Sequence, residues 1–315
     1  MWAEFNRQRA GEARGAKLVR MRPMSIDWID HVVLPVKSLA DASAAYERLG
    51  LTLTPTTRHT GQGTENRVFH VGSGANDFYV ELSGIHDPEA ARRSPRTALY
   101  LKAIEEGRGL ARLILGTADI AKTISEMASK GVKGEAESVS REGGAKICDT
   151  AALDVPGLNV TAGLIQYVEA REAMHTRRAA AGSFAHNFPL KRLDHLASAA
   201  PDIEGATRAW TDVLGVPVFG EIKGTGIIIR QMKIGDAIVE LLGPDGPESR
   251  MAGRPPGLSS MCAFEVPDLD AAVKLARERG FTPSEPNKGI LPGTRVASIP
   301  AMELFGMGLQ LLEYV

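Results

Sequence analysis

The chain has 315 residues, of which 43% are hydrophobic and 24% are charged, and its 37 basic and 38 acidic side chains leave a formal charge of -1. This balance excludes an obligate nucleic-acid binder, which needs a basic surface, and no apolar stretch reaches the roughly 18 to 20 residues that cross a bilayer. The length allows two domains of about 150 residues, each with its own core.

The N-terminal residues 1–25 are rich in arginine and lack the apolar run of a secretory signal, so we expect a disordered tail. An arginine-rich organelle leader and translation starting at Met21 or Met24 are the alternatives. Cys148 and Cys262 are too far apart in sequence for a CxxC metal knuckle or a disulfide framework. We therefore expect a cytoplasmic protein.

The next stretch, residues 26–168, alternates strand-like and helix-like segments in an order that occurs twice. Its helix closes on Leu49 and Gly50, where a glycine suits the C-terminal cap. The expected elements are a strand at 29–34 (IDHVVL), a helix at 38–49, a strand at 79–84 (YVELSG), a strand at 111–119 that ends in an acidic turn, a helix at 120–130 and a final strand ending at 166–168 (QYV). This order predicts a βαβββ unit, repeated.

Residues 169–191 are polar and rich in Ala and Arg, which predicts a surface connection between two domains. After it, residues 192–315 repeat the first pattern. The matching segments are 193–197 (LDHLA), a helix at 202–214 closing on Gly215, 238–243 (IVELLG), a strand at 260–268 leading into a helix at 269–279, and the end at 313–315 (EYV).

These repeats resemble the vicinal oxygen chelate superfamily of glyoxalases, bleomycin-resistance proteins, methylmalonyl-CoA epimerases and extradiol dioxygenases. The first copy also carries 59–67 (HTGQGTENR), similar to the GT-x-N stretch of glyoxalase-like domains. The resemblance covers residues 26–315 and implies an α+β fold of two tandem glyoxalase-like modules. Each module would be a duplicated βαβββ unit that forms a half-open curved sheet.

The resemblance also implies four inward-pointing metal-ligand positions in each module. In the second module they are His195, Glu240, Met261 and Glu313, and the thioether of Met261 is a poor ligand for hard divalent cations. His195, Glu240 and Glu313 could still hold Mn, Fe(II), Zn or Mg. If no metal binds, the two carboxylates and the histidine form a proton-transfer site. A structural role for such a strand histidine is the alternative.

In the first module the four positions are His31, Glu81, Arg112 and Gln166. A guanidinium repels a cation and would pair with Glu81 instead, so no metal is expected there. These residues either bind a ligand or only support the fold. Arg295, shortly before the last strand, could meet an anionic substrate at the mouth of the second cavity, although a solvated loop charge is the alternative.

The resemblance implies a metal-assisted lyase, isomerase or epimerase acting on a small oxygenated substrate through an enolate, with Glu240 and Glu313 as catalytic carboxylates. One alternative is a metal-free binding protein of the bleomycin-resistance type, and another is an extradiol dioxygenase, which needs a second histidine where Met261 stands. A purely structural role is a further alternative. The expected partner is a small molecule, with no nucleic acid or membrane, and the chain would be a monomer with paired modules or a homodimer.

Overall fold

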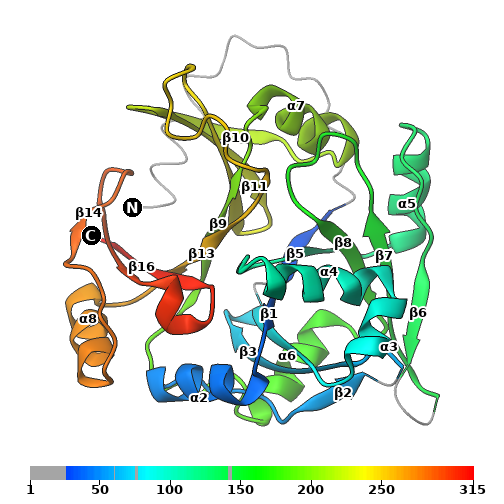
Figure 1. Ribbon diagram of the computed structural model, residues 1–315, viewed down its shortest axis with the longest axis horizontal. Coiled ribbons are helices and arrows are strands. Elements are labelled where there is room, and N and C mark those ends of the chain that lie inside the picture. The colour runs from blue at the N-terminus through cyan, green and yellow to red at the C-terminus, as the bar shows by residue number, and fades with distance from the viewer. Residues whose placement is uncertain (1–25, 60, 75–76, 141–143) are drawn as a thin grey trace.

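The computed structural model describes residues 26–59, 61–74, 77–140 and 144–315, so the tail expected at residues 1–25 lies outside the described part. Within it the chain builds two curved sheets, each of eight strands (Figure 1). The α+β fold of two tandem modules, each with a half-open curved sheet, is therefore confirmed.

The first module begins with a helix whose ends the sequence predicts well. The Ser38 hydroxyl accepts a hydrogen bond from the Asp41 amide at 3.2 Å, and Gly50 ends the helix with a left-handed φ of 96°. Its elements are β1 (Trp28–Val36), α2 (Leu39–Leu49), β2 (Thr57–His59), β3 (Thr64–Val71), β4 (Phe78–Ile85), α3 (Pro88–Arg93), α4 (Pro95–Glu105), β5 (Arg112–Gly116), α5 (Ile120–Ala128), β6 (Glu137–Ser140), β7 (Lys146–Leu153) and β8 (Ala162–Tyr167).

The second module repeats this plan, and its first helix starts where the Asp202 carboxylate caps the Gly205 amide at 2.8 Å. That helix continues into a π-helical turn, η2. The elements are β9 (Arg192–Ala199), α7 (Ile203–Arg208), η2 (Ala209–Val213), β10 (Val218–Gly224), β11 (Ile227–Ile234), β12 (Ala237–Gly243), β13 (Gly257–Glu265), α8 (Leu269–Glu278), β14 (Asn287–Lys288), β15 (Thr294–Ile299), the 3₁₀ turn η3 (Ala301–Leu304) and β16 (Gly308–Tyr314).

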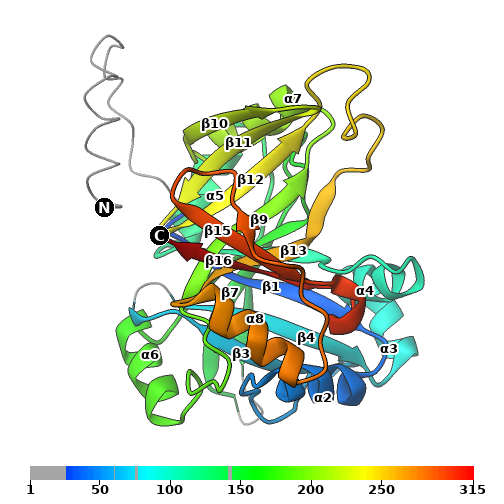
Figure 2. The ribbon, with the colours of Figure 1, turned by 90° about the vertical axis from the view of Figure 1, so that its left-hand side faces the viewer.

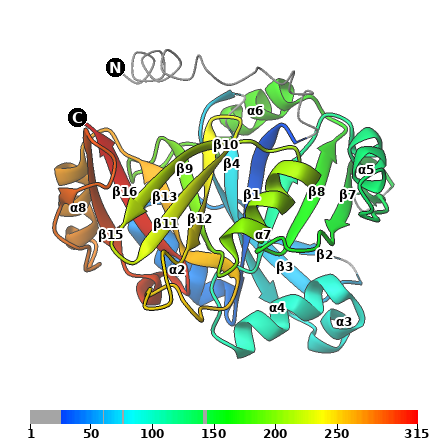
Figure 3. The same ribbon diagram turned by 90° about the horizontal axis from the view of Figure 1, so that it is seen from above.

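The strand order is the same in both sheets: β2-β3-β4-β1-β5-β8-β7-β6 in the first and β10-β11-β12-β9-β13-β16-β15-β14 in the second. The central strands β1 and β9 each pair in parallel with the fourth strand and antiparallel with the fifth. Helices α2, α5, α7 and α8 pack against the sheets (Figure 3). Each sheet therefore buries its convex face and curves around a concave one.

The two modules share one apolar core and dock through specific contacts. The Tyr46 hydroxyl of α2 donates to the Leu304 carbonyl of η3 at 3.0 Å, and the Arg48 guanidinium lies 4.5 Å from the centre of the Phe281 ring, beyond α8 (Figure 2). At the other contact the Trp210 indole donates to Asn159 at 3.2 Å. These contacts fix the modules side by side.

The stretch between the modules is more than a surface connection, because it contains helix α6 (Arg171–Ala180). This helix packs on the first module, where Met174 is buried and His175 lies 2.7 Å from the Asp77 carboxylate. Ala and Arg are strong helix formers, so the composition of residues 169–191, which predicted a surface connection, suits a helix equally well. No helix in the described part of the chain is long and apolar enough to cross a membrane. Cys148 and Cys262 are free, as their separation in sequence predicted, and both are buried.

Candidate functional site

The concave face of the second sheet brings His195 and Glu240 together. His195 of β9 lies opposite Ile238 of β12, and two residues further on Ala197 lies opposite Glu240, so these side chains share one face. The His195 Nε2 and Glu240 Oε2 atoms are 3.8 Å apart. Both side chains are only partly buried, with 17% of His195 and 13% of Glu240 exposed.

The preceding residue, Asp194, sets the orientation of the His195 ring. Its carboxylate lies 2.9 Å from His195 Nδ1 and accepts hydrogen bonds from Tyr314 at 2.7 Å and from Arg192 at 3.2 Å. A carboxylate only accepts, so Nδ1 carries the proton and Nε2 faces Glu240. Burial of Asp194 favours a raised pKa, but these partners outweigh it and lower the pKa.

The same surroundings shift the pKa of His195. Burial favours a lower pKa, but the Asp194 hydrogen bond and the Glu240 charge outweigh it, and the pKa of His195 is raised above its ordinary value. The Gln310 side chain adds to this effect by hydrogen bonding to the ring. His195 is therefore poised to carry a proton beside an ionised carboxylate.

Two glutamines complete the site, and the sequence analysis assigned neither. Gln231 of β11 lies opposite Glu240, is buried, and donates a hydrogen bond to Glu240 Oε1 at 2.9 Å. Gln310 of β16 lies opposite Ala263 of β13, which in turn lies opposite His195. The eighth-strand position on the concave face is therefore Gln310.

Glu313 does not join His195 and Glu240. It lies three residues after Gln310, and side chains alternate between the two faces of a strand, so Glu313 points to the convex face. There its carboxylate lies 3.0 Å from Arg295, which also binds Asp270 of α8 at 2.8 Å. Arg295 accordingly lies on the outer face, away from the cavity mouth where the sequence suggested it.

The residues beside His195 fit a divalent cation only as a three-donor set: the His195 nitrogen, a Glu240 oxygen and the Gln310 amide oxygen. The Asp194 contact at Nδ1 is the second-shell partner that metal-binding histidines usually have. Met261 lies two residues before Ala263 on β13, opposite Gly308, and its side chain offers only a thioether. Among the described residues, no group of three or more His, Cys, Asp or Glu side chains could hold a metal ion.

The concave face of the first module is built on the same plan, with its histidine more deeply buried. His31 Nε2 lies 3.9 Å from Glu81 Oε2, its Nδ1 lies 2.7 Å from Asp30, and its ring stacks on Tyr79 with centroids 4.3 Å apart. Asp30 also accepts a hydrogen bond from Tyr167 at 2.9 Å. The His31 side chain is 9% exposed against 17% for His195, whereas Glu81 and Glu240 are both 13% exposed.

Arg112 occupies the position in the first module that Met261 has in the second, because it lies opposite Val33, two residues after His31. The eighth-strand position there is Gly163, opposite Ile114, and a Cβ on it would lie 2.4 Å from Arg112 Nη2. The guanidinium thus fills the space of the missing side chain. It forms no ion pair with Glu81 in the described part of the chain, contrary to the sequence-based expectation, and lies instead beside Tyr100.

Gln166, predicted to point into the first cavity, lies on the outer face instead, three residues after Gly163. Its side-chain amide accepts from the Ile120 amide and donates to the Ala118 carbonyl, both at 2.9 Å, and so fixes the start of α5. Its role is structural.

Two helices cover the first concave face. Tyr100 of α4 is buried near Glu81 and Arg112. Helix α6 places the Arg178 guanidinium 5.7 Å from the centre of the Tyr79 ring and 6.0 Å from that of Tyr167. In the second module the corresponding connection, residues 244–256, contains no helix.

His70 lies under this cover and makes a pH-dependent contribution to stability. Burial and the nearby Arg178 charge lower its pKa to about 3. In the unfolded chain His70 gains a proton below about pH 6.5, whereas in the folded chain it stays neutral until about pH 3. The contribution of the neutral His70 to the free energy of unfolding is therefore fully present above pH 6.5 and is lost as the pH falls toward 3.

We expect His70→Gln to flatten the pH dependence of the free energy of unfolding between pH 6.5 and pH 4.5. The predicted difference is about 1.4 kcal/mol per pH unit, measured by urea denaturation at several pH values. His86→Gln, at an exposed position, is the matched control. Parallel curves for the wild-type protein and His70→Gln would contradict the assignment.

Comparisons with known proteins support the repeated architecture. A family model described as a glyoxalase-like domain matches residues 29–183, and one described as the glyoxalase/bleomycin resistance protein/dioxygenase superfamily matches residues 194–297. The chain is similar to the mitochondrial methylmalonyl-CoA epimerase of Bos taurus, with 29% identity over 148 residues that cover 43% of this chain and 79% of the relative. The Mus musculus enzyme is 34% identical over 93 residues, 27% of this chain and 52% of the relative.

One solved structure resembles both modules together. A variant of 4-hydroxymandelate synthase from Streptomyces coelicolor superposes with a TM-score of 0.64, covering 92% of this chain and 93% of that chain. The sequence identity is 14%, so the likeness shows the fold alone. The superposition includes both sheets and their arrangement relative to each other.

Proposed function

Because the chain belongs to the glyoxalase/bleomycin resistance/dioxygenase superfamily and carries two of its modules in tandem, we propose that its second module moves a proton on a small oxygenated substrate. The reaction class is that of an isomerase, epimerase or lyase. The observation that carries the proposal is the His195 and Glu240 pair, 3.8 Å apart on the concave face. The similarity to two methylmalonyl-CoA epimerases supports this class.

Glu240 is the proposed base. Gln231 holds its Oε1 atom, so Oε2 is left facing His195 and the cavity. This oxygen takes a proton from a carbon next to a carbonyl group, and the electron pair of the broken C–H bond moves into the carbonyl to give an enolate. His195, held by Asp194 and with a raised pKa, donates its Nε2 proton in a hydrogen bond to the enolate oxygen. Protonation of the opposite face of the enolate carbon by a water molecule, with Glu240 releasing its proton to solvent water, gives the epimer.

A divalent cation such as Mn, Fe(II), Zn or Mg would be held by the Nε2 atom of His195, by Glu240 and by Gln310, and it would then take the place of the His195 Nε2 proton. When bound, a divalent cation supplies Lewis-acid polarisation of a carbonyl oxygen. The donor set contains one carboxylate and one neutral amide, so the affinity for the cation should be modest. Met261 adds only a weak thioether donor.

We expect the purified protein to exchange the hydrogen next to the carbonyl group of methylmalonyl-CoA, or of another small acid in a test panel, for deuterium in D₂O. The exchange is measured by NMR. Dialysis against EDTA should slow it roughly tenfold or more, and Mn²⁺ should restore it. His195→Ala should lose bound metal and exchange together, because it removes the nitrogen donor.

The matched control is Glu313→Ala, which removes a carboxylate from the outer face of the same sheet and should keep both properties. Absence of exchange across the panel, with and without metal, would overturn the proposed reaction. Exchange that is insensitive to EDTA would overturn the role of the cation and leave proton transfer by His195 and Glu240.

A metal-free binding protein of the bleomycin-resistance type is the second candidate. It is favoured by Met261 and Gln310, neutral residues at two of the four ligand positions on the concave face. This candidate predicts tight ligand binding at His195 and Glu240 without exchange of any hydrogen. The exchange measurement above therefore distinguishes the two functions.

A further inference from the structure

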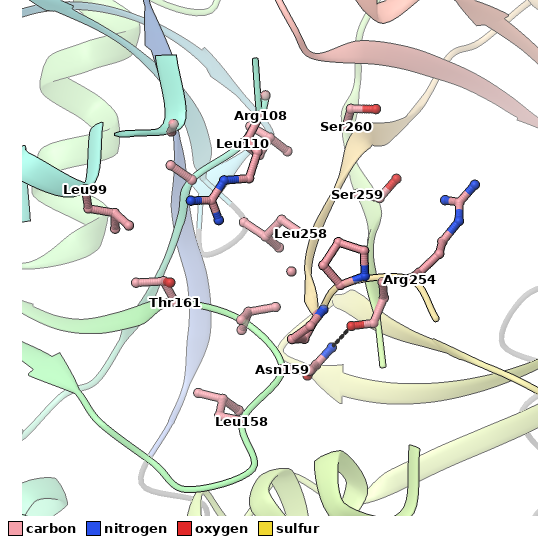
Figure 4. Close-up of a pocket in the computed structure, with 18 of the residues that line it drawn as sticks. Leu99, Arg108, Leu110, Leu158, Asn159, Thr161, Arg254, Leu258, Ser259 and Ser260 are labelled. Atoms are coloured by element: carbon pink, nitrogen blue, oxygen red, sulfur yellow. Dashed lines mark hydrogen bonds between the residues drawn. The ribbon is translucent and has the colours of Figure 1, made fainter. Parts of the chain in front are cut away.

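A cavity of about 730 Å³ lies between the two modules (Figure 4). The first module contributes helix α4, the segment before β5 and the connection from β7 to β8. The second module contributes the ends of β9 and β12 and the segment leading into β13. A volume of this size is typical of pockets that enclose a small organic molecule.

This cavity continues the concave face that carries Glu240. Leu242 lines the cavity, and it follows Glu240 by two residues on β12, so both side chains point to the same face. Ala199 lines it as well, and it lies opposite Leu242. The Cα atoms of Glu240 and Leu242 are about 7 Å apart along the strand. One elongated molecule can therefore reach from Glu240 into the cavity.

The cavity wall next to this strand is apolar. Leu242 and Ala199 pack with Ile227, Ile229 and Met251 in one hydrophobic cluster. Further leucines line the cavity from both modules, namely Leu99, Leu110, Leu158 and Leu258. The middle of a bound molecule should accordingly be apolar, because burying it against this wall removes apolar surface from water.

Two arginines line the same cavity, Arg108 from the first module and Arg254 from the second (Figure 4). Arg108 is 51% exposed and pairs with Glu106, whereas Arg254 is exposed and makes no side-chain contact found in the described part of the chain. Asp154 also lines the cavity. The lining residues carry a formal charge of +1, and because Arg108 is paired with Glu106, Arg254 is the cation left to meet an anionic group. Arginine binds carboxylates and phosphates through two parallel hydrogen bonds.

We propose that this cavity binds the non-reacting part of the substrate, an apolar body that ends in an anionic group. The inference rests on the proposed function, since the reacting carbonyl group lies at Glu240. The first module then has a binding role in catalysis: it closes the substrate cavity of the second module with Arg108, Leu110 and Leu158. The substrate is an amphipathic acid with the carbonyl group at one end and the anion at the other.

The test uses two fluorescent probes of closely similar shape, the anionic 1-anilinonaphthalene-8-sulfonate and the uncharged N-phenyl-1-naphthylamine. We expect the sulfonate to bind the full-length protein roughly tenfold more tightly than the uncharged probe. This is the difference in affinity that one charge-assisted hydrogen bond contributes. Arg254→Ala should remove most of this difference. Arg93→Ala, at an exposed position of α3, should leave both affinities unchanged.

Leu158→Trp, which fills the cavity from the first module, should weaken both probes about tenfold or more, and thermal melting checks that this variant is folded. The inference is overturned if Arg254→Ala binds the sulfonate as the wild-type protein does, or if a folded Leu158→Trp binds both probes normally. Glu240→Gln should bind both probes normally and lose deuterium exchange. Failure of this inference and failure of the proposed function therefore give different results.

Discussion

Replacing Glu240 by Gln should reduce the rate of deuterium exchange by a factor of about 10² to 10⁴, the usual contribution of a positioned general base. The substitution keeps the size and planarity of the side chain, and the amide oxygen can still accept the hydrogen bond from Gln231. It removes the basic oxygen that faces His195 at 3.8 Å. The fold should be unaffected, so the loss is one of chemistry and is measured by NMR.

The matched control for Glu240→Gln is Glu313→Gln, the same change on the outer face of the second sheet. The Glu313 carboxylate pairs with Arg295 and faces α8, so its loss should leave the exchange rate unchanged. Its effect on stability should be below about 1 kcal/mol, since the pair is partly exposed. Equal effects of the two substitutions would show that neither carboxylate is the base.

The contrast between Glu240 and Glu313 shows how far the sequence predicts this site. The first-strand histidine and the fourth-strand glutamate follow from the repeated segments, and the structure places them together. The sequence does not predict the eighth-strand residue correctly. Side chains alternate between the two faces of a strand, so choosing a residue three positions too late on the last strand selects a side chain on the outer face instead of the concave one. The sequence analysis paired Gln166 with Glu313 correctly, but both lie on outer faces.

A sequence signal for the true register does exist beside those two residues. Tyr167 and Tyr314 follow Gln166 and Glu313, and each tyrosine donates a hydrogen bond to the aspartate that precedes the first-strand histidine. Because the tyrosines point inward, residues four positions earlier also point inward, namely Gly163 and Gln310. The repeated tyrosine therefore fixes which residues of the last strand face the cavity.

The fold is predictable from the sequence to the extent that its local signals are strong. The order of strands and helices follows from caps such as Ser38 and Asp202 and from the alternation of apolar residues. The packing of helix α6 on the first module cannot be predicted from the sequence. The helix is polar on most of its surface, and the residues that it contacts, Asp77 and Tyr79, lie about a hundred positions earlier in the chain. Such contacts depend on tertiary packing rather than on local propensity.

Replacing Arg112 by Met, the residue at the matching position of the second module, should lower the free energy of unfolding by about 1 to 3 kcal/mol, the usual cost of leaving a buried polar group without its partner. Arg112 is only 7% exposed, hydrogen bonds to Tyr100, and shares its surroundings with Glu81. Its removal leaves the buried Tyr100 hydroxyl without this partner, takes a positive charge away from the neighbourhood of Glu81, and leaves the space beside Gly163 empty. Urea denaturation measures the change.

A second substitution distinguishes the charge effect from the packing effect. Arg112→Met combined with Glu81→Gln removes one negative charge together with the positive one, so it should recover part of the lost stability if charge dominates. Met261→Leu in the second module is the control for packing alone and should cost less than about 1.5 kcal/mol. If Arg112→Met costs no more than Met261→Leu, the guanidinium is not a structural replacement for a metal. If it costs the predicted amount, the Arg112 guanidinium stabilises the first module as a fixed charge at the position that Met261 has in the second.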